Sequence, residues 1–165
     1  MATAKLKTIE GKQVSTFLSG NMYYFRYLAE PTNVYFDRFP LIFVIRKRGR
    51  LIEGINFHYI NYKYRTQLFE EMKVFFDEAE ITEDTRLRVK SFRQILLTAR
   101  KYKFAKVALH KYNMNSVRSK IIKISPTVWD RVILEDAEKF VTGSGGRMNS
   151  EKVFRESLIK SRETR

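Results

Sequence analysis

Residues 41–60 have the sequence LIFVIRKRGRLIEGINFHYI, in which two apolar runs flank a short basic segment. The first run is rich in β-branched residues, which favour strands. Gly49 lies between the two runs, where a tight turn needs a residue with unusual backbone freedom. The stretch therefore predicts a β-hairpin with a charged tip. Gly54, inside the second strand, predicts a bulge or a sharp bend, by which small sheets curl into barrels.

The residues around the hairpin add two further strands and two long helices. An aromatic-rich segment, residues 22–27, predicts a strand before the hairpin, and residues 120–124 predict a final strand. After Tyr62 the spacing of apolar residues changes from two to about 3.6. This change predicts one helix over about 62–78 and a second over about 83–102, with Thr82 as the N-cap of the second.

The segment after these helices is harder to interpret. Residues 104–109 are compatible with a strand, and residues 113–119 with a short turn or helix. Ser125 and Pro126 predict the start of a helix that contains Trp129, because proline is favoured at the first helical position.

The chain of 165 residues has the length of one domain with appended segments. We expect an N-terminal arm over residues 1–19, a single domain over 20–140, a flexible Gly/Ser linker over 141–149 and an amphipathic tail over 150–165. The expected fold class is α+β. Its sheet is expected to be small, antiparallel and curled, of SH3-like or open-barrel type, and packed by two or three helices.

The composition excludes several classes of protein. Hydrophobic residues make up 44% of the chain and aromatic residues 14%, which is enough for a core and excludes wholesale disorder. No apolar run approaches the roughly 18 residues of a membrane-spanning helix, so we expect no membrane partner. The chain has no cysteine, which excludes disulfides, thiolate zinc sites and cysteine nucleophiles. Its two histidines cannot form a closed zinc site alone, and we expect neither metal nor cofactor.

The charge of the chain points to a polyanionic partner. Thirty-two Lys and Arg residues against eighteen Asp and Glu give a net charge of +14. Residues 86–131 hold thirteen of these cations and a single acid, Asp130, whereas residues 66–85 hold seven acids and one lysine. A surface of this kind attracts nucleic acid first, and anionic membranes or acidic protein surfaces second.

The candidate nucleic-acid-binding residues are cations of the hairpin tip, of one face of the second helix and of the segment after it. They are Arg46, Lys47, Arg48, Arg50, Arg86, Lys90, Arg93, Arg100, Lys101, Lys103, Lys106, Lys111, Arg118 and Lys120. The sequence carries no homeodomain, zinc-finger or RNP signature, which favours binding to the DNA backbone or ends over base readout. Aromatic residues interleave with the cations, and two or three of them are expected to stack on terminal or unpaired bases; the candidates are Tyr62, Tyr64, Tyr102, Phe104 and Tyr112.

Catalytic groups are sparse. The strand region offers only Asp37 and Glu53 as carboxylates, too few for a metal-dependent nuclease. Gly143–Gly146 lacks the Lys-Ser/Thr pair of a phosphate-binding loop. His58 has two interpretations: a functional residue that acts as general base or contacts a phosphate, or a hydrogen-bonded, half-buried histidine at the end of a strand. We therefore expect no enzyme and keep the nuclease as an alternative.

Two blocks of the sequence resemble a known family. Residues 36–43 read FDRFPLIF and residues 54–60 read GINFHYI, with Arg65 a few residues on; a second block joins residues 118–120 to Trp129. Both resemble the DNA end protector proteins, small virion proteins of large contractile-tailed bacteriophages. The residues that carry the resemblance are Asp37, Arg38, Pro40, Gly54, Asn56, His58, Arg65 and Trp129.

The resemblance implies a non-enzymatic virion protein that binds double-stranded DNA without sequence specificity and protects genome ends from exonucleases. Such a protein is expected in the virion and, after infection, in the host cytoplasm. The alternative is a structural adaptor of the phage head, neck or tail that contacts acidic protein partners. The sequence leaves the oligomeric state open. Two roles are possible for Asp37, Arg38, Asn56 and His58, holding the barrel together or contacting DNA. Asp37 has two possible partners in Arg38 and Arg65.

Overall fold

The strands form two antiparallel sheets. The computed structural model describes residues 11–29, 35–81, 85–142 and 146–163, and the side chains of these residues except 74–92 and 161–163. The larger sheet has six strands in the order β1 (Gly11–Val14), β7 (Ile121–Ile124), β2 (Met22–Tyr24), β4 (Leu41–Arg48), β5 (Leu51–Asn56) and β6 (Leu109–Asn113). The smaller sheet has the order β3 (Tyr35–Asp37), β8 (Phe140–Thr142) and β9 (Arg147–Met148).

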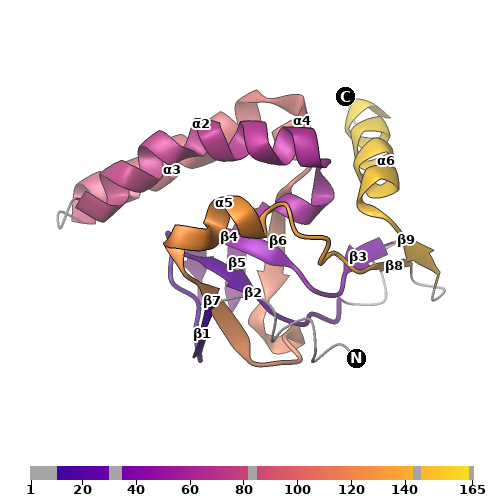
Figure 1. Cartoon of the computed structure of the whole chain (residues 1–165), viewed down its shortest axis with the longest axis horizontal. Coiled ribbons are helices and arrows are strands. Elements are labelled where there is room, and N and C mark those ends of the chain that lie inside the picture. Colours follow the sequence, from indigo (N-terminus) through magenta and orange to yellow (C-terminus); the bar gives the residue numbers. More distant parts are fainter. Residues whose placement is uncertain (1–10, 30–34, 82–84, 143–145, 164–165) are drawn as a thin grey trace.

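The long helices lie on one side of the larger sheet. The helix α2 (Tyr62–Ile81) and the helix α3 (Thr85–Lys101) lie side by side, and the pair extends past the sheet at one end (Figure 1). The shorter elements are α4 (Lys103–Lys106), α5 (Trp129–Val132) and the 3₁₀ helices η1 (Phe57–Tyr59), η2 (Met114–Ser116) and η3 (Pro126–Val128). The helix α6 (Ser150–Glu163) follows β9, near the end of α2 at which α4 lies (Figure 1).

The centre of the six-stranded sheet is buried on both faces. Side chains alternate along β4: Leu41 and Phe43 belong to one hydrophobic cluster, while Ile42 and Val44 belong to another. The first cluster contains residues of α2, α3, α5 and α6 and forms the main core. The second cluster includes Phe17, Tyr23, Phe25, Ile52, Tyr112 and Ile121. Because a central strand with two buried faces is apolar throughout, β4 reads as a continuous run of five apolar residues.

The predicted hairpin is confirmed, and its irregularity lies opposite the glycine. Arg48 pairs with Leu51 across the turn, where Gly49 has a φ of +58°. The register shifts between Val44 and Arg46 of β4, opposite Gly54. A Cβ on Gly54 would lie 2.6 Å from the carbonyl oxygen of Phe43. The glycine thus permits a close approach of two backbones, and the extra residue of the bulge is in the partner strand.

The α+β class is confirmed, but the curled barrel is wrong. Within the described residues neither sheet is closed, and β1 and β6 are the edges of the six-stranded sheet. Strand β7 lies between β1 and β2, and among the described residues the edge strands β1 and β6 do not pair with each other, so the sheet stays open.

The helices over 62–78 and 83–102 are confirmed as α2 and α3, whereas the predicted N-cap Thr82 lies outside the described residues. The strand over 104–109 is wrong, because Lys103–Lys106 forms α4 and the strand begins at Leu109. The hairpin's second strand ends at Asn56, so His58 lies in η1 and not on a strand.

Both predicted appendages contact the main body. Within the predicted arm, β1 pairs with β7 and Phe17 is fully buried. Within the predicted tail, Val153 and Phe154 of α6 belong to the main core. The strands β8 and β9 pair with each other across the Gly/Ser segment. The division of the chain at residues 19, 140 and 149 stays a prediction. In the part of the chain that the structure describes, no helix is long and apolar enough to cross a membrane.

Candidate nucleic-acid interface

Asp37 lies at the centre of a buried polar network. Its Oδ2 atom lies 2.6 Å from Nδ1 of His58 and accepts a hydrogen bond of 3.1 Å from Nδ2 of Asn56. Its Oδ1 atom accepts hydrogen bonds from the backbone N–H groups of Phe39 and Lys139, at 3.0 and 3.2 Å. One carboxylate thereby connects β3, β5, η1 and the segment that leads into β8. Asp37 is paired with His58, and neither predicted partner, Arg38 nor Arg65, forms this contact.

The surroundings of Asp37 stabilise its charged form. Burial alone acts to raise the pKa of this carboxyl group, but the attraction to His58 and the hydrogen bonds from His58, Asn56 and the Phe39 backbone outweigh it. The pKa of Asp37 is therefore lowered from its ordinary value. Asn56 also donates a hydrogen bond of 2.9 Å from Nδ2 to the hydroxyl of Tyr112, so the network reaches β6.

Arg65 forms a second buried centre. Its side chain is fully buried, and its Nε donates to the carbonyl oxygen of Ile60 at 2.8 Å. Its Nη1 donates to the carbonyl of Ile133 at 3.0 Å, and its Nη2 donates to Oγ of Ser150 at 2.9 Å and lies 3.9 Å from Oε2 of Glu138. This arginine thus joins the start of α2 to the segment after α5 and to the first residue of α6. Ser150 and Glu138 had no signal in the sequence, because they lie far from Arg65 along the chain.

The other residues of the two sequence blocks are mostly internal as well. Gly54, Pro40 and Trp129 are buried, and Nε1 of Trp129 donates to the carbonyl of Ile124 at 3.0 Å. Arg38 is half-buried. His58 is fully buried, and within the described residues its Nε2 has no hydrogen-bond partner. A ring in this position cannot reach a phosphodiester outside the protein. The described residues also bring no three His, Asp or Glu side chains together as a metal ion would require.

Exposed arginines occur at the hairpin tip and in the segment next to it, and two of them contact Asn115. We call Arg48, Arg50 and Arg118 the tip cluster, and all three are exposed. The Nε of Arg50 donates to Oδ1 of Asn115, and the Nη1 of Arg118 donates to the carbonyl of the same residue at 2.6 Å. The hydrogen bonds hold two guanidinium groups beside each other without neutralising them, since Asn115 carries no charge. Arg26 is exposed as well. Its backbone carbonyl accepts a hydrogen bond of 2.9 Å from the N–H of Arg118, so Arg26 lies next to the tip cluster.

The remaining cations of the hairpin are partly engaged within the protein. Arg46 forms an ion pair with Glu53, which is also the cross-strand neighbour of the exposed Lys111. Lys47 donates to Oγ1 of Thr16 at 3.0 Å. Lys120, beside β7, is exposed. Arg46 is the weakest of these candidates because its charge is already balanced.

A second group of cations lies along the second half of α3 and on α4. We call Arg93, Arg100, Lys101, Lys103 and Lys106 the α3–α4 cluster, and all five are exposed. Within the described residues, none of them forms an ion pair with a carboxylate. Arg86 and Lys90, the other two members of the predicted helical ridge, have side chains outside the described residues.

The edge strand β6 connects the two clusters. It begins just after α4 and ends at η2, next to the hairpin tip, where Leu51 pairs with Asn113. Its five residues span about 16 Å. In Figure 1 the arrow of β6 points away from the layer formed by α2, α3 and α4. Lys111 lies in the middle of this strand, so exposed cations occur at both ends of β6 and between them.

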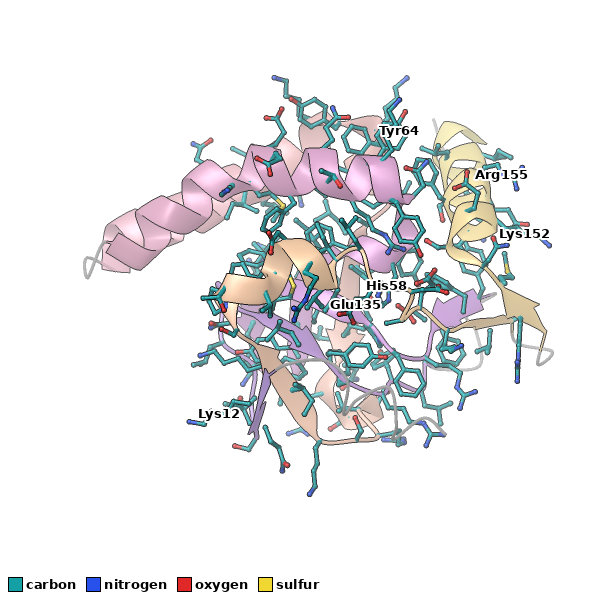
Figure 2. All side chains as sticks on the ribbon, in the orientation of Figure 1. Lys12, His58, Tyr64, Glu135, Lys152 and Arg155 are labelled. Carbon is teal, nitrogen blue, oxygen red and sulfur yellow. The ribbon has the colours of Figure 1, made fainter. Side chains whose placement is uncertain are left out.

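Three aromatic rings form a stacked column beside the α3–α4 cluster. The rings of Tyr64 and Phe104 are 4.5 Å apart with an angle of 17° between their planes, and those of Phe104 and Tyr102 are 5.4 Å apart at 26°. All three side chains are half-buried. Tyr64 lies near α6 (Figure 2), where its ring contacts Phe154. Tyr112, another predicted stacking residue, is buried on the other side of the sheet, with only 5% of its surface exposed.

Comparison with known proteins identifies the family of the chain. The family described as phage T4 terminal DNA protecting protein matches residues 2–157, which is nearly the whole length. The chain belongs to this family. No curated protein and no solved structure matches it. The family is named for protection of genome ends, which is a non-enzymatic role in a bacteriophage. The resemblance seen in the two sequence blocks is therefore confirmed.

Proposed function

We propose that this protein binds the ends of double-stranded phage DNA through its phosphates, without reading the base sequence, and so blocks exonucleases. The observation that carries the proposal is the set of exposed cations in the tip cluster and the α3–α4 cluster, which lack carboxylate partners among the described residues. Cations of this kind release counterions from DNA when they bind, which supplies affinity for any sequence.

The distribution of the cations supports backbone contact over base readout. They come from a β-turn, an edge strand, the end of a helix and a short helix, and no single element presents them as a set. Contacts of scattered arginines and lysines to phosphates fix the position of a protein on DNA but carry no sequence information. This arrangement suits a protein that must act on the same genome end whatever bases it meets there.

The location and the protein partners belong to the same proposal. We place the protein in the virion, bound to the packaged genome, from where it reaches the host cytoplasm with the DNA. A second candidate function is contact with an acidic protein of the head, neck or tail. The outer side of α6 favours it, because Lys152 and Arg155 are exposed there beside Ile159, of which 53% is exposed (Figure 2).

The test compares a linear duplex with a closed circle of the same sequence, across a salt series and with an exonuclease challenge. The wild-type protein should bind and protect the linear form preferentially. Reversing two charges of the α3–α4 cluster, with Arg93→Glu and Arg100→Glu, should weaken binding on the order of 100-fold at low salt and reduce the salt slope by about two.

The matched control reverses two exposed lysines that belong to neither cluster, with Lys12→Glu and Lys152→Glu (Figure 2). Lys12 lies on β1, the opposite edge of the sheet from β6. This control changes the net charge equally, so it should retain most of the affinity if position matters. Equal loss in both double variants would contradict the assignment of the α3–α4 cluster. If the wild-type protein binds the linear duplex and the closed circle equally weakly and does not protect the linear form from the exonuclease, the adaptor role is favoured.

A further inference from the structure

Phosphate contacts alone do not distinguish a DNA end from a duplex interior. Both present the same charged backbone, so the tip cluster and the α3–α4 cluster attract them alike. A blunt end differs in one respect: the flat face of its last base pair has no neighbour to stack on. Aromatic side chains stack on such faces whatever the base, because every base has a π-face. End preference therefore calls for an accessible aromatic ring among the cations.

The column of Tyr64, Phe104 and Tyr102 has the required form. Tyr102 and Phe104 are two residues apart, a spacing that on a continuous helix directs side chains to different sides. Tyr102 lies between α3 and α4 and has an extended backbone, with φ −96° and ψ 127°. This break in the helical path lets its ring stack on that of Phe104. The break between the two helices thus places the ring of Tyr102 at the end of the column. Tyr102 stacks on Phe104, which stacks in turn on Tyr64.

Positive charge surrounds this column. The Nζ atom of Lys101 lies 5.6 Å over the ring centroid of Tyr102, and that of Lys63 lies 5.9 Å over the ring of Tyr64. Contacts between an exposed ammonium group and a ring are weak, so a base can displace the lysine from the ring. The displaced ammonium group is then free to contact a phosphate. Arg100 and Lys103, on either side of Tyr102 and Lys101 in the chain, are exposed as well.

We propose that Tyr102, at the end of the aromatic column, stacks on the face of the terminal base pair while Arg100, Lys101 and Lys103 contact the last phosphates. This inference rests on the proposed function and adds the contact that separates an end from an interior. Phe104 stacks behind Tyr102 and Tyr64 stacks behind Phe104, and all three rings pack against the main core, which holds the column in place.

The first measurement needs only the wild-type protein. The fluorescent base 2-aminopurine, whose emission falls when it stacks, is placed at the terminal position of one duplex and at an interior position of another. Binding should lower the emission of the terminal probe and leave that of the interior probe unchanged. An unchanged terminal probe on a duplex that is fully bound would overturn the role of Tyr102 and leave the proposed function intact.

The second measurement compares an open duplex with a dumbbell whose ends are closed by loops. Tyr102→Leu, which keeps an apolar side chain, should bind the dumbbell like the wild-type protein but bind the open duplex roughly tenfold more weakly, the effect of losing one base–aromatic stack. Tyr102→Phe should behave like the wild-type protein. The matched control is Tyr35→Leu, because Tyr35 is another half-buried tyrosine with a lysine, Lys160, 5.2 Å over its ring.

The outcomes separate this inference from the proposed function. Retained end preference in Tyr102→Leu, or an equal loss in Tyr35→Leu, would overturn the stacking role while DNA binding itself stands. A wild-type protein that binds neither the open duplex nor the dumbbell would overturn both proposals.

Discussion

The polar residues around Asp37 and Arg65 and the cations along β6 use charge in opposite ways. Asp37 and Arg65 are at most 1% exposed, and their hydrogen bonds join segments that lie far apart in the sequence. The tip cluster and the α3–α4 cluster are exposed and lack acidic partners among the described residues. The first region fixes the relative positions of β3, β5, α2 and α6. The second leaves positive charge exposed at the surface, where we propose that DNA binds.

Most of the recognisable residues of the two blocks lie inside the protein, whereas most of the cations that we propose to contact DNA lie outside the blocks; Arg118, in the second block, is an exception. The blocks that resemble the end protectors contain Asp37, Asn56, His58 and Arg65, and all four lie inside the protein. A buried polar residue tolerates little exchange, because each of its hydrogen bonds needs a specific partner. A phosphate contact needs only a positive charge within reach. Mutations that separate folding from DNA binding test this comparison directly.

The largest loss of stability is expected for Arg65→Met. The substitution keeps a long side chain but leaves the carbonyls of Ile60 and Ile133 and the hydroxyl of Ser150 without their donor. Breaking one partner out of a buried ionic network costs about 3–5 kcal/mol of unfolding free energy. Urea unfolding measures this loss. The control is Arg155→Met on the exposed side of α6, whose unfolding free energy should differ from that of the wild-type protein by no more than about 0.5 kcal/mol. A similarly small effect at Arg65 would contradict its structural role.

A smaller and pH-dependent loss is expected for Asp37→Asn, about 2–3 kcal/mol at neutral pH for the lost charge-assisted hydrogen bonds. Because the pKa of Asp37 is lower in the folded protein than its ordinary value of 3.8, the charged carboxylate stabilises the fold above that value. The stabilisation is lost as the pH falls through the folded-state pKa. The difference between the wild-type protein and the variant should therefore shrink in acid, as urea unfolding down to about pH 2 would show. A constant difference would mean that shape, and not charge, matters at this position.

The smallest effect on stability is expected in the tip cluster. Replacing Arg50 and Arg118 together by alanine should change the unfolding free energy by less than about 1 kcal/mol, because both side chains are exposed. The same double variant should bind DNA more weakly and lower the salt slope by about two. Binding across a salt series and urea unfolding of one preparation measure both effects. If the double variant is much less stable but binds DNA normally, Arg50 and Arg118 stabilise the fold and do not contact DNA.

The parts of the fold that could be predicted from the sequence are those with local causes. The turn at Gly49 and the helices α2 and α3 follow from spacing and backbone freedom within a few residues. The open sheet could not be predicted, because β7 reaches its place between β1 and β2 from about a hundred residues away. The strand expected over 104–109 failed because Ala105 is buried on the short helix α4 and Ala108 in the turn after it, and an apolar run of this length does not distinguish a helix from a strand.

The candidate site divides in the same way. Exposure of the cations could be expected from their charge alone. The aromatic column could not, because Tyr64 and Phe104 meet only after α2 and α3 have folded back on each other. The burial of Arg65 was equally hidden, since its principal partners are backbone carbonyls that carry no sequence signal.

The place of β7 also decides when the protein can finish folding. The strands β1 and β2 are made early in synthesis, yet both pair with β7, which ends at Ile124. Pairings between distant segments form slowly, because the intervening chain loses much of its freedom before any contact compensates for it. Until residues 121–124 have left the ribosome, β1 and β2 cannot form their pairings with β7. The sheet is therefore assembled late, after most of the chain has been made.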